Sequence, residues 1–335
     1  MTPAFARPLL VTANLLDRVR SLLLSWFGRP LSPLFRDREL RIAWLGATSI
    51  VVTLVFTVWA PGLLLTWGPL LLGVPHLVAD GRYLIARRGL FARPFALLLV
   101  VLPALGAWSG GGASMGALSI VAAGVVAQAT VLPRLGVIAV GLGFAATAHR
   151  FGRTADLAFA HLHNLVAIAA WLAWPWMTRG ARSTWRHLVV VGTFVVAALL
   201  LATGRFDRWA FPALFAVADI NELIPRFAFD TSPTWAVRAT LLFAFAQSVH
   251  YGVWLRLMPD EDRERTAPRP FARSVEALAV DLSWPVVILA TLVTLAFLAY
   301  GAFDAVAARD GYLRLALFHG PMELGLIALL LVERR

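Results

Sequence analysis

Apolar stretches of membrane-spanning length, repeated along the whole chain, constrain its fold more than any other feature. A helix of about 17–25 apolar residues crosses the hydrocarbon core of a bilayer. The 335-residue chain is 59% hydrophobic and only 15% charged, which leaves too little polar surface for a soluble protein of this size. The sequence therefore predicts an all-α, polytopic transmembrane bundle of about ten spans. The expected spans cover residues 42–60, 62–86, 95–108, 113–131, 135–149, 156–177, 187–203, 235–258, 284–302 and 312–332.

The positive charge of the chain is best explained by topology. The 30 basic residues, all of them arginine, exceed the 19 acidic residues and give a net charge of +11. With the N-terminus in the cytoplasm, ten spans place most of these arginines in cytoplasmic segments, as the positive-inside rule requires. We therefore expect both termini in the cytoplasm and an integral protein of a bacterial inner (cytoplasmic) membrane. Nucleic acid is not an expected partner, whereas membrane lipids are.

The chain is expected to form a single membrane domain over residues 1–335 with three distinctive segments. The apolar run within residues 1–38 is interrupted by Asp17, Arg18 and Arg20, which predicts an N-terminal interfacial amphipathic segment. Residues 204–234 predict a re-entrant or amphipathic segment on the outer side, and residues 259–274 a polar cytoplasmic loop. The apolar side of the first segment carries Leu15, Leu16, Val19, Leu22, Leu23 and Trp26.

The residue types that are missing narrow the possible chemistry. The chain has no cysteine, which excludes disulfides, thiolate metal sites, cysteine nucleophiles and cysteine-ligated iron–sulfur clusters. It has no lysine, which excludes Schiff-base catalysis. Histidine and carboxylate side chains remain as the candidates for metal binding and acid–base chemistry.

Ionisable residues within the expected spans are the candidate functional groups, because such residues are costly in hydrocarbon and commonly mark function. His76 and Asp80 lie four residues apart, as do His319 and Glu323, so each pair shares one helix face. His161 and His163 are about 200° apart around a helix, so only one of them can face a given site. A polar contact between helices is the simpler role for any one of these histidines.

Together these residues predict a metal centre built from several helices. The depths of the histidines leave open whether they form one site or two. Ligands without sulfur suit non-haem iron, and zinc, copper and manganese accept the same donors. The candidate metal ligands are His76, His161, His163, His250 and His319, with His149 and Glu222 as further candidates, and the candidate catalytic residues are Asp80, Glu323 and Tyr251.

The segment GVPHLVAD, which contains His76 and Asp80, resembles the G-x-P-H-x-x-x-D signature of the Brp/Blh family of membrane β-carotene 15,15′-dioxygenases. The stretch from His149 to Asp156 loosely resembles the His-Phe-Gly-x-x-Asp element of that family, and the segments around His250 and His319 resemble its later histidine motifs. The resemblance implies histidine-held iron, dioxygen as co-substrate and a carotenoid-like substrate from the bilayer. The chain departs from the pattern where Trp254 stands in place of a second late histidine.

The leading hypothesis is an integral-membrane, metal-dependent oxidoreductase or oxygenase, with non-haem iron, that acts on a lipophilic, carotenoid- or lipid-like substrate. A proton-coupled transporter would also use histidine and carboxylate groups within the membrane. A b-haem protein with two histidine ligands on facing helices is a third hypothesis. Metal content and an optical spectrum distinguish the three.

Overall fold

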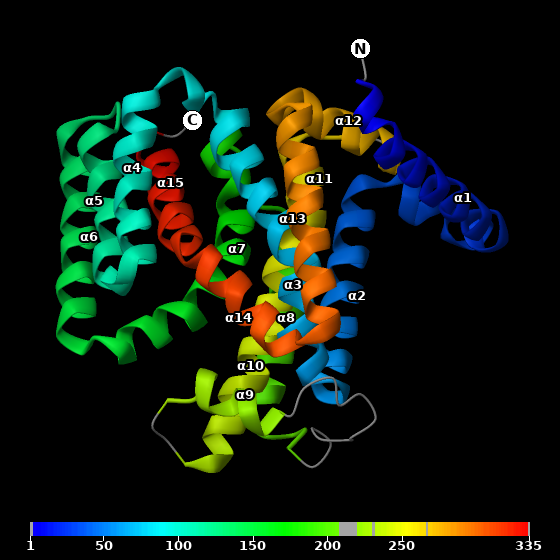
Figure 1. The fold of residues 1–335 in the computed structure, drawn as a ribbon. Helices are drawn as coiled ribbons and strands as arrows, with labels where there is room; N and C mark the ends of the chain where they lie inside the picture. Colours follow the sequence, from blue (N-terminus) through cyan, green and yellow to red (C-terminus); the bar gives the residue numbers. More distant parts are fainter. Residues whose placement is uncertain (1–2, 208–219, 230–231, 266, 334–335) are drawn as a thin grey trace.

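The computed structural model describes residues 3–207, 220–229, 232–265 and 267–333, and within these ranges it contains helices and turns without a β-strand. The helices form one bundle, and the beginning of α1 and the end of α15 lie at the same end of it (Figure 1). The longer helices are α1 (Arg7–Arg36), α2 (Arg38–Trp59), α3 (Pro61–Asp80), α4 (Pro94–Gly106), α5 (Gly112–Val126), α6 (Val131–Phe151), α7 (Arg153–Arg179), α8 (Trp185–Ala202), α10 (Pro233–Gly252), α13 (Trp284–Phe303) and α15 (His319–Glu333). The shorter helices are α9 (Ile220–Phe227), α11 (Met258–Asp262), α12 (Phe271–Leu282) and α14 (Ala305–Leu315).

Eight helical segments of the described chain are long and apolar enough to cross a membrane. They identify an integral membrane protein and confirm the helical bundle, while the count of ten spans stays a prediction. The segments are Arg38–Trp59, Pro61–Arg88, Pro94–Val126, Val131–Phe151, Arg153–Arg179, Trp185–Ala202, Trp284–Phe303 and Ala305–Glu333.

The difference between eight and ten comes from two places in the chain. Pro94–Val126 is one continuous segment in this count, but Gly110 has a φ of 108° and breaks the helix. The chain folds back there, so that α4 and α5 lie side by side (Figure 1). The expected span 235–258 corresponds to α10 and the π-helical turn Val253–Leu257 that follows it, and it is not among the eight.

The last expected span, 312–332, is a broken helix. Helix α14 ends at Leu315, a 3₁₀ turn occupies Ala316–Phe318, and α15 begins at His319 with a changed direction (Figure 1). Pro321, which lacks a backbone N–H, favours a helix start at this point. Non-helical backbone at membrane depth is tolerated where it is buried in protein or lines a cavity. The break places His319 and Glu323 at the first turns of α15.

Helix α1 carries the expected apolar face. Leu15, Leu22 and Trp26 are about half exposed or more, with 59%, 53% and 68% of their surfaces accessible. The helix contacts α2 and α12, and it extends away from the bundle (Figure 1). An apolar stripe of this kind on a peripheral helix is typical of a helix that lies in the membrane interface.

The polar segment 259–274 contains buried acidic groups, which the sequence did not indicate. Glu261 is fully buried, and its carboxylate lies 2.5 Å from Arg179, 2.9 Å from Arg186 and 3.3 Å from the Nε2 atom of His187. Burial by itself raises the pKa of Glu261, but the hydrogen bond with His187 and the charge of Arg186 outweigh it and lower the pKa to about 2. Glu261 therefore joins α11 to α7 and α8 by ion pairs. His187 is part of this structural network.

Much of the expected outer segment 204–234 lies outside the described residues. Within it the structure describes α9, which contains Glu222. Glu222 is exposed.

Candidate metal centre

Four helices each contribute one histidine to a single cluster, in which three of the histidines are buried and His163 is half-buried. His76 lies on α3, His163 on α7, His250 on α10 and His319 at the start of α15. The ring centroid of His319 lies 4.6 Å from that of His76, 4.9 Å from that of His163 and 6.0 Å from that of His250. The Nε2 atoms of His76 and His319 are 3.0 Å apart. The histidines thus form one site, a question that the sequence left open.

Glu323 brings one carboxylate oxygen into the middle of the cluster. Its Oε2 atom lies 3.5 Å from Nδ1 of His163 and 3.5 Å from Nε2 of His319. Nε2 of His250 lies 3.9 Å from the same oxygen. The position follows from the sequence, because His319 and Glu323 are separated by one helical turn on α15.

Ligand atoms at these separations could hold one metal ion. Metal–nitrogen and metal–oxygen bonds of about 2.0–2.2 Å place neighbouring ligand atoms about 3.0–3.5 Å apart, depending on the coordination geometry. His163, His250, His319 and Glu323 each offer a ligand atom, and these atoms all lie within 4.8 Å of one another. His76 adds a fifth donor through its contact with His319.

Two further side chains, those of Asp80 and Trp254, contact members of the cluster on the sides that face away from its centre. Oδ2 of Asp80 lies 3.0 Å from Nδ1 of His319, on the far side of that ring from Glu323. The indole N–H of Trp254 donates a hydrogen bond of 3.1 Å to Oε1 of Glu323, which leaves Oε2 turned to the histidines. Carboxylates that bind the outer nitrogen of a metal-ligating histidine are a common feature of metal sites.

The cluster as described lacks partners for many of its polar atoms. Both carboxylate oxygens of Asp80, Oε2 of Glu323, Nε2 of His250 and Nδ1 of His163 are buried without a hydrogen bond within the described chain. Asp80 and Glu323 are both fully buried, and no arginine among the described residues forms an ion pair with either. Two ionised carboxylates buried in this way are strongly unfavourable unless a cation accompanies them, and protonation is the other way to remove their charge. A divalent cation supplies the missing ligand partner and balances both charges, so the donor set fits a metal ion.

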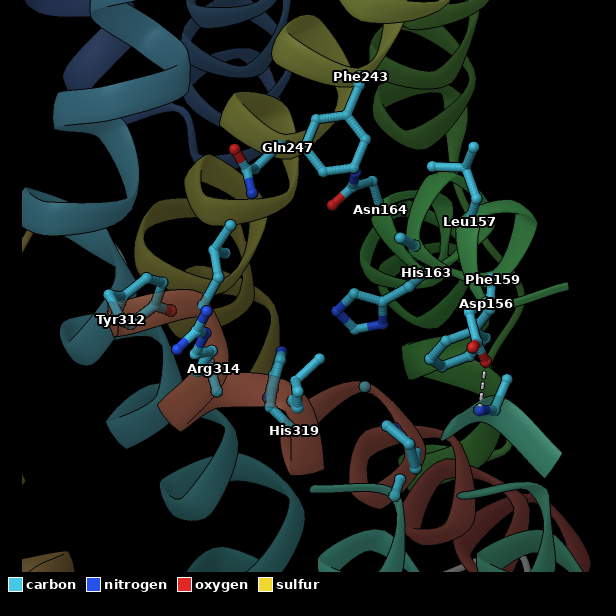
Figure 2. Close-up of a pocket in the computed structure, with 18 of the residues that line it drawn as sticks. Asp156, Leu157, Phe159, His163, Asn164, Phe243, Gln247, Tyr312, Arg314 and His319 are labelled. Atoms are coloured by element: carbon cyan, nitrogen blue, oxygen red, sulfur yellow. Dashed lines mark hydrogen bonds between the residues drawn. The ribbon is translucent and has the colours of Figure 1, made fainter. Parts of the chain in front are cut away.

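A cavity of about 600 Å³ leads to the cluster. His76, His163, His250 and His319 form part of its wall (Figure 2). Phe159, which Figure 2 labels, and other aromatic and aliphatic side chains make much of the remaining wall. Charged residues lie around the same cavity, namely Asp156, Arg226, Arg309, Asp310 and Arg314.

Figure 2 also shows the element that closes one side of this cavity. The carboxylate of Asp156, at the start of α7, accepts a hydrogen bond of 2.7 Å from the backbone N–H of Ala113 at the start of α5. The bond fixes the end of the α4–α5 hairpin against α7. Asp156 therefore has a structural partner of its own and lies at the cavity wall.

The structure brings most of the expected site residues together. His76, Asp80, His163, His250, His319 and Glu323 meet in the two overlapping groups that could hold a metal. Tyr251 lies beside them, with its ring centroid 4.5 Å from that of His76, and it lines the cavity.

Three of the expected ligands lie elsewhere. His161 faces away from His163, as the helical spacing required, and its Nε2 atom lies 2.9 Å from the carbonyl oxygen of Phe227. His149 is exposed near the end of α6, and Glu222 is exposed on α9. None of these three residues is in either group of potential ligands.

Trp254 is the residue whose role sequence reasoning missed. It occupies the position one turn after His250 and lies within the π-helical turn Val253–Leu257. Its fully buried indole supports Glu323. A tryptophan in a polar histidine neighbourhood was the available signal, because a buried indole N–H needs an acceptor.

Comparisons of the chain with protein-family models, with curated proteins and with solved structures found no match.

Proposed function

We propose that the chain is an integral-membrane oxidoreductase with a mononuclear non-haem metal centre, iron in the first place, that acts on a lipophilic, carotenoid- or lipid-like substrate. The observation that carries the proposal is the convergence of four histidines and Glu323 beside a largely apolar cavity. Ligand atoms of His163, His250 and Glu323 have no hydrogen-bond partner there. The resemblance of GVPHLVAD to the Brp/Blh dioxygenases points the same way.

Each residue of the cluster has a definite task in this proposal. His163, His250, His319 and Glu323 are the ligands, and His76 completes the set from the cavity side. Asp80 holds the proton on Nδ1 of His319 and so keeps its Nε2 free to ligate. Trp254 holds the Glu323 carboxylate in one orientation.

The bound iron would supply the capacity to activate dioxygen, and the protein would supply orientation and exclusion of water. The cavity walls exclude water, because Phe159, Phe227 and Phe243 line the approach to the histidines. Tyr251 places a ring directly against His76, where it borders the space that a substrate would occupy. An apolar wall of this kind favours a substrate that arrives from the bilayer.

A haem fits the arrangement less well than a single ion. The centroids of the other three imidazole rings lie 4.6 to 6.0 Å from that of His319, and each of the three rings meets it edge to face. A macrocycle between two of these histidines would have to pass through the positions of the others and of Glu323.

Metal analysis of the detergent-purified chain tests the proposal. We expect one equivalent of iron per chain in the wild type and at least a tenfold loss in His163→Ala and His250→Ala. His161→Ala is the matched control, because His161 lies two residues from His163 on the same helix but faces Phe227. A metal-free wild type, or an equal loss in the control, would contradict the metal centre.

The reaction class needs a second measurement. Purified, iron-loaded protein is incubated with a membrane lipid and carotenoid extract under ¹⁸O₂, and the products are examined by mass spectrometry. We expect label in a lipophilic product, and no label with His250→Ala. A metal-loaded wild type that gives no oxidised product would leave the metal centre standing but overturn the oxygenase.

Proton-coupled transport is the alternative that the buried carboxylates favour. Asp80 and Glu323 border the same imidazoles, an arrangement that also suits a proton relay. A chain that binds no metal but takes up substrate into proteoliposomes in response to a pH gradient would support that alternative.

A further inference from the structure

A second cavity, which Trp254 also lines, combines an apolar wall with arginine side chains. Its volume is about 650 Å³, within the range of roughly 300–1,000 Å³ typical of ligand sites. Helices α1, α3, α12 and α13 supply most of the apolar wall. The arginines that line it are Arg20, Arg82, Arg256, Arg265 and Arg269, against a single acidic residue, Asp260.

Three of these arginines are neutralised within the protein. Arg82 lies 2.7 Å from the carboxylate of Asp281, and Arg256 lies 2.7 Å from that of Asp260. Arg20 lies 3.3 Å from the carboxylate of Asp17. Because each of these arginines is paired with a carboxylate, the three pairs add no net positive charge to the cavity.

Arg265 and Arg269 form no ion pair with an acidic residue in the part of the chain that the structure describes. Both are half-buried. Burial, followed by the charges of Arg265 and Arg82, lowers the pKa of Arg269, which shows that its guanidinium lies among like charges. An anion between Arg265 and Arg269 would offset the cost of burying two positive charges and would reduce the repulsion between them.

The position of the cavity indicates where such an anion comes from. It lies against α1, whose exposed leucines and Trp26 mark a helix of the membrane interface. It is also at the end of the bundle that carries α12 (Figure 1), the end we expect to face the cytoplasm. Basic pockets between membrane helices on that side bind anionic lipid headgroups.

We propose that this cavity is a binding site for an anionic phospholipid, with its phosphate between Arg265 and Arg269 and an acyl chain along α1, α3 and α13. The lipid, rather than free phosphate, accounts for the apolar wall. The site is separate from the metal centre, and the proposal does not depend on the proposed function.

Binding to the full-length, detergent-purified chain tests the proposal. The probes are phosphatidylglycerol, phosphatidylcholine and inorganic phosphate, and the readouts are native mass spectrometry and the shift in unfolding temperature. We expect phosphatidylglycerol to bind about 30-fold more tightly to the wild type than to the double variant Arg265→Gln/Arg269→Gln, since each arginine contributes about fivefold. We expect phosphatidylcholine to bind the two proteins equally weakly.

The matched control is the double variant Arg263→Gln/Arg273→Gln. It removes the same charge from the same segment, but both residues are exposed and neither lines the cavity. We expect its affinity for phosphatidylglycerol to stay within about twofold of the wild type, because the interaction is local. The single variant Arg269→Gln gives the same comparison if the first double variant does not fold.

Several outcomes would overturn the lipid site. Equal binding of phosphatidylglycerol and phosphatidylcholine to the wild type would show that charge plays no part. An equal effect of inorganic phosphate would assign the site to a free anion, and an equal loss in the control variant would reduce the effect to net charge. His163→Ala is expected to keep the lipid and lose the metal, so the two proposals fail independently.

Discussion

Asp80 contacts the candidate metal centre through His319. Its carboxylate lies 3.0 Å from Nδ1 of His319, and it is fully buried. A negative charge at this distance makes the opposite nitrogen of the ring a better donor to a metal. The group thus positions a ligand without needing to bind the ion.

Asp80→Asn is expected to lower metal affinity about 10- to 100-fold, because the amide keeps the shape of the side chain but removes its charge. Competition with a chelator of known affinity measures the change. Asp304→Asn is the control, since Asp304 caps α14 by accepting a hydrogen bond from Ala307 and asparagine caps equally well. An unchanged affinity in Asp80→Asn would show that the contact with His319 does not tune the site.

Some of these residue roles follow from the sequence and others do not. The pairs His76/Asp80 and His319/Glu323 were predictable because four residues make about one helical turn. The same periodicity predicts that His161 and His163 face different surroundings, but not which of the two reaches the site. Which histidine reaches the site depends on how α7 packs against α10 and α15, and the local sequence does not indicate that packing.

At the scale of the helix, the site depends on the break between α14 and α15. A continuous helix over 312–332 would hold His319 at a depth set only by its place in the sequence. The turn Ala316–Phe318 lets α15 start at a new angle and brings His319 beside His76. Pro321 signals a discontinuity, but the new direction of α15 comes from its packing against α4, α5 and α7.

Gly320 permits the close approach of α15 to α7. A Cβ atom at this position would lie 3.1 Å from Nδ1 of His163 and 3.1 Å from the ring of Phe159. We expect Gly320→Ala to lower the free energy of unfolding by about 1–3 kcal/mol and to lower the metal content, because His163 must move. Thermal unfolding and metal analysis measure the two effects.

Gly192→Ala is the control for that substitution. A Cβ atom there would meet no atom within 4 Å, and Gly192 lies within α8. Both changes gain about the same helix propensity, so the difference between them reports the contact. If Gly320→Ala kept its metal and matched the control in stability, the close approach would be shown to be unimportant.

The ion pairs of Glu261 make a prediction about pH. The pKa of Glu261 is lowered to about 2 in the folded protein, from 4.5 for an ordinary glutamate. The folded state therefore favours the carboxylate form more than the unfolded state does. Its contribution, on the order of 3 kcal/mol, is complete above pH 4.5 and is lost as the pH falls toward 2.

Unfolding temperatures at pH 6 and pH 3.5 test this contribution. We expect the wild type to lose more stability between these values than Glu261→Gln, which lacks the titrating group. Glu264→Gln serves as the control, because its side chain is 66% exposed and should behave as the wild type does. Parallel losses in all three proteins would show that Glu261 does not contribute to the acid sensitivity.

At the scale of the whole molecule, hydropathy was enough to predict a helical membrane bundle, but not how the helices are divided. The turn at Gly110 lies between two spans that the sequence predicts, whereas the break before His319 divides an expected span without any change in its composition. The buried acidic residues of segment 259–274 show that hydropathy also fails to predict the burial of polar residues. Residues that look solvated in the sequence become buried when arginines of other helices, such as Arg186, surround them.

The orientation of the bundle is a prediction that single cysteines can test, since the native chain contains none. Arg273 is 74% exposed on α12, and Arg150 is exposed near the end of α6, at opposite ends of the bundle (Figure 1). Because most arginines should face the cytoplasm, we expect a membrane-impermeant maleimide to label Arg150→Cys in spheroplasts. Arg273→Cys should react only after the membrane is opened. The reverse pattern would invert the orientation and place the arginine-lined cavity on the outer face, whereas labelling of both variants in intact spheroplasts would contradict a membrane between the two ends.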